Sequence, residues 1–151
     1  MPVTARQFFK RISIKTYPSQ KTFDLCKKHN EKQPEFYFTK DTTFAVGNQT
    51  FKTFYPGEGH SPDNIVVWFG KQKILYGGCL VKRIENNSLG NVADANFAAW
   101  PKSIRKTMGQ FPNLTFVIPG HFGWQSNKAL EHTVKLLKKD RKKRSKLIFY
   151  P

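Results

Sequence analysis

The stretch Tyr55–Lys82, YPGEGHSPDNIVVWFGKQKILYGGCLVK, most constrains the fold of this chain. A glycine-rich turn containing His60 leads into two short apolar runs, Ile65–Phe69 and Ile74–Tyr76, and Cys79 follows the second run. Strands that are apolar on both faces need cover on both sides of their sheet. The stretch therefore predicts two neighbouring strands inside a layered α/β domain.

Three candidate metal ligands stand where a predicted strand runs into a turn: His60, Cys79 and His121. Strand ends and the loops beyond them commonly present functional groups. Neutral imidazole together with thiolate suits zinc, and three protein ligands with one open position are typical of a catalytic zinc. The gaps between the three residues match no compact zinc finger, so spacing alone leaves a structural role open for each of them.

Four blocks of sequence occur in an order that resembles a known family. They are Gly57–Asn64 (GEGHSPDN) running into Ile65–Trp68, then Gly77–Lys82 (GGCLVK), Leu89–Ala95 (LGNVADA) and Pro119–His121 (PGH). In this order and at these spacings they resemble the C-terminal half of the first, broad-spectrum subclass of metallo-β-lactamases. The resemblance runs from about Ala5 to about Leu137. The family's upstream His-x-His-x-Asp motif does not occur in the 151 residues, so the chain resembles the family without its first half.

The resemblance implies an α/β fold, namely the C-terminal half of the family's αββα sandwich, with a mixed sheet and outer helices. We therefore expect a partial metallo-β-lactamase domain over residues 1–137 and a basic C-terminal tail over residues 138–151. Because half of the sandwich is missing, the inward face of the sheet is expected to lack its partner layer.

The resemblance also implies site residues. In the family two zinc ions lie in one cleft; His60 matches the third histidine of the first zinc site, and Cys79 and His121 match ligands of the second. Lys82 matches the residue that pairs with the substrate carboxylate, and Asn91 matches the catalytic residue near the lactam carbonyl. The absent motif would supply the other three ligands. The chain is therefore expected to hold one zinc ion at most, and weakly.

These matches imply a zinc-dependent β-lactamase, a hydrolase in which zinc-bound hydroxide opens the β-lactam amide and so confers antibiotic resistance. With half of the ligands missing, the truncated chain is expected to be inactive alone. The alternative is a non-enzymatic basic binding protein that reuses half of the fold. The upstream coding sequence separates the two, because an in-frame His-x-His-x-Asp segment before Met1 supports the enzyme, whereas a stop codon with an independent promoter supports the alternative.

The charge of the chain bears on its partners. Its 26 lysines and arginines against 10 acids give a formal charge of +16, which favours polyanions. The run Lys138–Lys146, KKDRKKRSK, is interpreted first as a solvated, partly disordered tail, and the alternative is an electrostatic contact with nucleic acid or a membrane surface. No aromatic residue is interleaved for base stacking, so nucleic-acid contact through this tail is not expected. The expected partners are a β-lactam in the intact enzyme and either a second copy or the missing N-terminal half.

Membrane-spanning segments, signal peptides and cysteine frameworks in a sequence bear on where the protein is located. No apolar run is long enough to cross a membrane, and Met1–Arg6 lacks the apolar segment of a signal peptide. The resembled enzymes are exported, so a periplasmic or secreted location is expected from the family, and a cytoplasmic one if the chain is made as given.

Two distant cysteines predict no disulfide framework, and Cys26 in a helical pattern is expected to be buried.

Periodicity and turn residues predict the remaining elements. Helices are expected at Phe8–Ile12, Ser19–His29, Asp94–Met108 (with Pro101 at a kink or break) and Ser126–Lys139. Further strands are expected at Phe36–Phe38, Thr42–Val46, Phe51–Tyr55 and Leu114–Ile118. His29 and His132 are interpreted as surface or packing residues rather than ligands.

Overall fold

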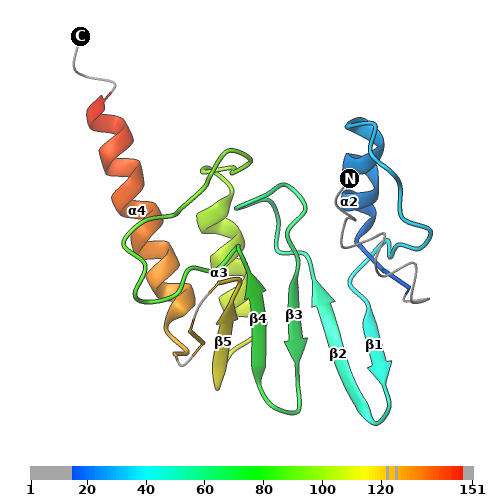
Figure 1. Ribbon diagram of the computed structural model, residues 1–151. Coiled ribbons are helices and arrows are strands. Elements are labelled where there is room, and N and C mark those ends of the chain that lie inside the picture. Colours follow the sequence, from blue (N-terminus) through cyan, green and yellow to red (C-terminus); the bar gives the residue numbers. More distant parts are fainter. Residues whose placement is uncertain (1–14, 122, 125, 148–151) are drawn as a thin grey trace. The chain divides into compact units, whose positions relative to one another are not determined.

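The computed structural model describes residues 15–121, 123, 124 and 126–147, with the backbone alone for the last two (Figure 1). The helix expected at Phe8–Ile12 lies outside these residues. The chain divides into two compact units, the first ending at Thr42 and the second beginning at Thr43. None of the described helices is long and apolar enough to cross a lipid bilayer.

The first unit is built around helix α2, Gln20–Lys28. Ser19 caps the helix, because its side chain accepts a hydrogen bond from the backbone N–H of Thr22 at 3.2 Å. The segment expected to be a strand at Phe36–Phe38 forms only an isolated bridge between Phe38 and Ser19, so that prediction was wrong. Cys26 is half-buried on a helix that has no fully buried residue, which corrects the expectation of a buried thiol.

The second unit contains a five-stranded sheet in the order β1-β2-β3-β4-β5. Its strands are β1 Thr43–Val46, β2 Gln49–Phe54, β3 Val66–Phe69, β4 Ile74–Gly78 and β5 Phe116–Pro119. The first four pair antiparallel as a meander, and β5 joins β4 in parallel. The mixed sheet expected from the sequence is confirmed.

One face of this sheet forms the core. Val66, Leu75 and Val117 alternate onto that face from three adjacent strands, and each is 0 % exposed. Helix α3, Trp100–Gln110, and helix α4, Ala129–Leu147, supply the other wall of the core. Figure 1 shows both helices beside strands β4 and β5.

The two helices differ from the sequence prediction in their limits. Helix α3 begins at Trp100 rather than Asp94, and Pro101 lies in its first turn, where proline needs no hydrogen-bond acceptor, so no kink or break occurs there. Helix α4 continues to Leu147, so the basic residues from Lys138 onward are helical rather than a partly disordered tail. The boundary expected between residues 137 and 138 falls inside α4, whereas the extent of the partial domain stays a prediction.

The opposite face of the sheet is also apolar. It carries Phe51 on β2, Val67 and Phe69 on β3, and Ile74 and Tyr76 on β4, which share one side because residues paired across strands point the same way. We call this side the outer face. Its apolar side chains are half-buried or exposed, and Tyr76 reaches 43 % exposure. The core helices therefore cover only one side of the sheet.

Candidate metal centre at the strand ends

Cys79 and His121 form a direct pair at one edge of the sheet. Strands β4 and β5 are parallel, and Gly78 pairs with Pro119, so the residues that follow both strands emerge at the same edge. The Sγ atom of Cys79 lies 3.3 Å from Nε2 of His121. The topology thus joins two residues that are 42 positions apart in the sequence.

Gly120 permits this close approach. Its backbone N–H donates to the carbonyl oxygen of Gly78 at 2.8 Å. A Cβ atom at Gly120 would lie 2.7 Å from the backbone nitrogen of Cys79 and 2.9 Å from its Sγ. Such distances leave no room for a side chain, and backbone cannot move away as cheaply as the end of a flexible side chain.

We expect the Gly120→Ala variant to unfold at a lower urea concentration, with about 1–3 kcal/mol less free energy of unfolding, because overpacking forces the backbone apart. Gly109→Ala is the matched control, since an added Cβ there meets nothing within 4 Å and Gly109 lies in helix α3, where alanine is the better helix former. The control is expected to be neutral or slightly more stable. Equal urea midpoints for the two variants would contradict this account of Gly120.

The Cys79–His121 pair fits two ligands of a zinc ion. With Zn–S near 2.3 Å and Zn–N near 2.0–2.1 Å, two tetrahedral ligands stand about 3.6 Å apart, close to the observed separation of the sulfur and nitrogen atoms. Within the described parts of the chain, however, no three His, Cys, Asp or Glu side chains lie close enough together to hold a metal ion. The geometry supplies half of a zinc coordination shell.

His60 lies beside this pair but does not complete it. Its imidazole makes an edge-to-face contact with the indole of Trp100, with the ring centroids 5.5 Å apart. Burial lowers the pKa of His60, and the charges of Lys82 and His121 lower it further, while a backbone hydrogen bond at Asn91 and the charge of Asp94 oppose them. The net lowering favours the neutral imidazole, which is the form that binds metals.

The loop that carries His60 is held by its own polar side chains. The Asn64 amide donates to the carbonyl oxygen of Gly57 at 2.8 Å, and its side-chain oxygen accepts from the backbone N–H of Ser61 at 2.9 Å. The backbone N–H of Asn96 donates to the carbonyl oxygen of Gly59 at 2.8 Å. These bonds hold the loop backbone on either side of His60, because the Asx-type contacts replace regular secondary structure.

Lys82 is buried next to the same residues. Only 7 % of it is exposed, and its Nζ atom lies 5.4 Å from the centroid of the Trp100 indole. Burial lowers the pKa of Lys82, and the neighbouring Cys79 partly offsets this. A desolvated ammonium group gains most from an anionic partner, so Lys82 is suited to bind a carboxylate.

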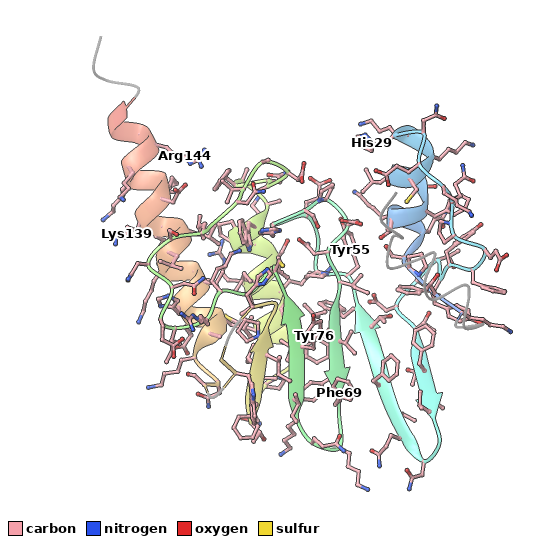
Figure 2. The ribbon with its side chains drawn as sticks, viewed as in Figure 1. His29, Tyr55, Phe69, Tyr76, Lys139 and Arg144 are labelled. Atoms are coloured by element: carbon pink, nitrogen blue, oxygen red, sulfur yellow. The ribbon has the colours of Figure 1, made fainter. Side chains whose placement is uncertain are left out.

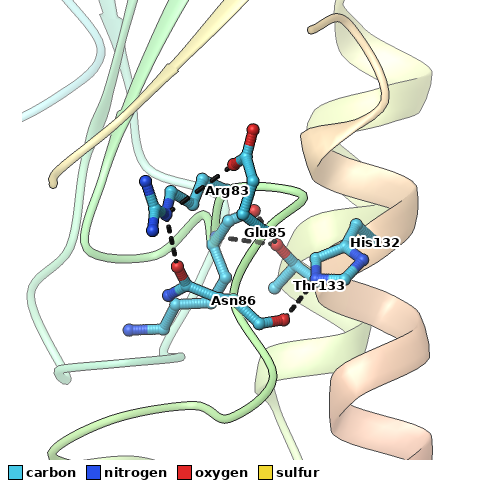
Figure 3. Close-up of polar contacts among 6 residues, drawn as sticks. Arg83, Glu85, Asn86, His132 and Thr133 are labelled. Atoms are coloured by element: carbon cyan, nitrogen blue, oxygen red, sulfur yellow. Dashed lines mark hydrogen bonds and ion pairs between the residues drawn. The ribbon is translucent and has the colours of Figure 1, made fainter. Parts of the chain in front are cut away.

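The segment after Lys82 is anchored to α4, as Figure 3 shows. The backbone N–H of Lys82 donates to the Thr133 hydroxyl at 2.8 Å, and Nε2 of His132 lies 2.8 Å from the carbonyl oxygen of Asn86. His132 thus has a packing role, as the sequence predicted. The Arg83 side chain donates to the Asn86 side-chain oxygen at 2.9 Å. Helix α4 therefore holds the backbone at Lys82 in place.

Asn91 lies in the loop beyond this segment. It is exposed, and its side-chain oxygen accepts a hydrogen bond from the backbone N–H of Ala93 at 3.1 Å. The backbone contact with His60 places the Asn91 segment at the site, whereas the role of its side chain stays a prediction.

Sequence reasoning missed Trp100. Its indole is fully buried, contacts both His60 and Lys82, and donates from Nε1 to the carbonyl oxygen of Leu80 at 2.9 Å. The pattern indicated only one more aromatic residue in a helix. The importance of Trp100 depends on contacts with loops that are distant in the sequence, and hydrophobic periodicity does not predict such contacts.

Comparisons with known proteins give one consistent family. A metallo-beta-lactamase type 2 from Elizabethkingia meningoseptica is 35% identical over 131 residues, which cover 87% of this chain and 53% of that protein. The corresponding protein from Bacillus cereus is 41% identical over 129 residues, covering 85% and 50%. No protein-family model matches the chain.

Solved structures agree with the sequence matches. A metallo-beta-lactamase from Pontibacter korlensis superimposes with a TM-score of 0.85 and 37% identity, covering 90% of this chain and 63% of that one. The chain therefore spans about half the length of the curated relatives that it matches, and somewhat more of the solved ones.

Proposed function

We propose, on the premise that this chain is homologous to metallo-β-lactamases over about half of their length, that it carries part of the active site of a zinc-dependent β-lactamase. The Cys79–His121 pair is the observation that carries the proposal. Its atoms are 3.3 Å apart at the end of two parallel strands, with neutral His60 and buried Lys82 close by. We assign this portion to the C-terminal half of the enzyme.

The three candidate ligands would belong to two neighbouring metal positions. Cys79 and His121 would hold one metal ion, and His60 would bind at the other position. A zinc ion bound in such a site supplies hydroxide near neutral pH by lowering the pKa of its water to about 7. The buried indole of Trp100 contacts both His60 and Lys82, and this shared contact would help to orient the two groups.

The substrate side of the proposal rests on Lys82 and Asn91. A β-lactam antibiotic carries a carboxylate, and the ammonium of Lys82 can pair with it to recover the free energy lost on burial. Asn91, exposed in the adjoining loop, would donate its amide to the lactam carbonyl. By the same relationship we expect the intact enzyme to act in the periplasm or outside the cell.

A cobalt titration tests the metal site without requiring activity. We expect the chain to bind one Co²⁺ or Zn²⁺ ion weakly, with thiolate-to-cobalt absorption, because modest movement of His60 would add a third ligand to Cys79 and His121. Cys79→Ser should abolish the thiolate band, and Cys26→Ser, which changes the other free thiol, should leave it intact. Binding should weaken as the pH falls, because the thiolate must form first.

The titration also tests whether His60, Cys79 and His121 bind one metal ion together. Equal metal affinity in the wild type and in Cys79→Ser would show that no composite site exists and that these residues have lost their metal-binding role. A thiolate band that persists in His60→Ala, at the same affinity, would restrict the site to Cys79 and His121.

A further inference from the structure

A groove between helices α3 and α4 is lined by basic side chains and lies apart from the metal centre. The groove has a volume of about 680 Å³. Lys102 and Arg105 lie on its α3 side, and Lys138, Arg141 and Lys142 lie on its α4 side. All five of these residues are exposed. None of the candidate zinc or substrate residues lines the groove.

Helical periodicity explains why the charges gather there. On α3 the buried residues Trp100, Ser103, Ile104 and Thr107 form one side, which leaves Lys102 and Arg105 on the other. On α4 the buried residues include Leu136 and Leu137, and the cations at positions 138, 141 and 142 follow the i, i+3, i+4 spacing of one helix face. Two neighbouring helices thus present cations toward a shared hollow.

Little negative charge offsets these cations. Asp140 is the acidic residue among those that line the groove, and it pairs with Arg144, with Nε and Oδ2 2.5 Å apart. Over its full length α4 carries eight lysines and arginines against two acids. Like charges this close repel one another, so a polyanion that neutralises several of them binds favourably.

The groove is suited to phosphates rather than to bases. Phe97 is its aromatic residue, and the Arg144 guanidinium lies over that ring, 3.8 Å from the centroid. The ring face on this side is therefore already occupied by a cation, so base stacking, the usual source of aromatic affinity for single strands, is blocked there. Contacts from Lys and Arg to phosphates remain, and these do not depend on sequence.

We propose that the α3–α4 groove binds the phosphate backbone of nucleic acid without sequence preference. The sequence alone argues against nucleic acid, because it predicts a solvated, partly disordered tail in which no aromatic residue is interleaved. An ordered helix opposite a second cationic helix changes that conclusion. A flat anionic membrane is the less suitable partner, because the apolar residues of α4 face the core and the cations face a concave groove.

Fluorescence anisotropy with a labelled mixed-sequence DNA 20-mer tests the proposal on the full chain. Neutralising about five phosphates predicts a slope of log K against log salt near −3.5 for a single strand. The affinity should then fall about 100-fold between 50 and 200 mM salt. A labelled strand of scrambled sequence should bind equally well.

Two triple variants with the same change in net charge show whether DNA binds at the groove or merely responds to the overall charge of the protein. Lys138→Glu, Arg141→Glu and Lys142→Glu together remove the α4 wall, and the control reverses the exposed Lys40, Lys71 and Lys73. We expect the first to lose at least about 30-fold in affinity and the second less than about 3-fold. Circular dichroism checks that both fold, and Lys→Gln and Arg→Gln replacements provide a second set at lower charge cost.

Three results would overturn the inference. Equal losses in the two triple variants would mean that overall charge, rather than the groove, binds DNA. Equal or tighter binding to vesicles containing phosphatidylserine, lost in the groove variant, would assign the groove to a membrane surface. A strong dependence on base sequence would also contradict backbone binding. Cys79→Ser should bind DNA normally, which keeps this test independent of the zinc site.

Discussion

Purified alone and supplied with zinc, the 151-residue chain is expected to hydrolyse penicillins and carbapenems negligibly. The sequence contains no His-x-His-x-Asp motif, and the described residues bring only Cys79 and His121 within reach of a common metal ion. With one or two protein ligands, an ion is neither held tightly nor fixed in geometry, and catalysis depends on both. Turnover approaching about 1 s⁻¹, the low end of ordinary enzymes, would contradict this expectation.

A complementation experiment sharpens that test. The half of a relative that this chain does not cover, taken from the Elizabethkingia meningoseptica protein, would be expressed together with the chain, and the intact relative would be assayed in parallel. Hydrolysis that requires both polypeptides and is lost in Cys79→Ser would support the proposed role of this chain. Hydrolysis that is unchanged in Cys79→Ser would locate the activity elsewhere.

The second large effect concerns the outer face of the sheet. We expect the isolated chain to bind the dye ANS strongly or to self-associate, because this face presents apolar side chains from adjacent strands that are half-buried or exposed. Aromatic pairs run across it, with the ring centroids of Phe44 and Phe51 5.3 Å apart and those of Phe51 and Phe69 5.7 Å apart. A continuous apolar patch of this kind marks an interface or an aggregation site.

Substitutions on the two sides of the sheet distinguish surface exposure from general instability. Val67→Thr with Tyr76→Lys makes the outer face more polar and should reduce dye binding and the apparent mass, with little loss of stability at the exposed Tyr76. Leu75→Ala, on the core side, should instead cost about 2–5 kcal/mol of stability and increase dye binding. A monomer with a cooperative thermal transition and no dye binding would show that the outer face is already covered.

The sequence predicted the sheet well because its signals are local. Apolar and β-branched runs predicted all five strands within a few residues, including Ile74 as the start of β4. Ser19 was correctly expected to open α2, since a side chain that caps a helix does so through its own neighbourhood.

Where the outcome depended on long-range packing, local signals failed. Phe36–Phe38 has the aromatic composition of a strand, yet it found no partner strand beyond one bridge to Ser19. The basic run after Leu137 has the composition of a tail, but it extends α4 because the preceding turns are packed against the core. Charge repulsion between successive lysines was not enough to end a helix that tertiary contacts had already nucleated.

The sequence by itself determined where the candidate site residues stand along the chain: His60, Cys79, Lys82 and His121 each lie in or after a strand or turn that the local pattern specifies. Only the tertiary structure decided what these residues meet. Parallel pairing of β4 with β5 brought Cys79 to His121, and the burial of Trp100 brought one indole into contact with both His60 and Lys82. The physical reason is that periodicity fixes the side of a strand or helix on which a residue lies, whereas the group that covers that side is chosen by packing between segments far apart in the chain.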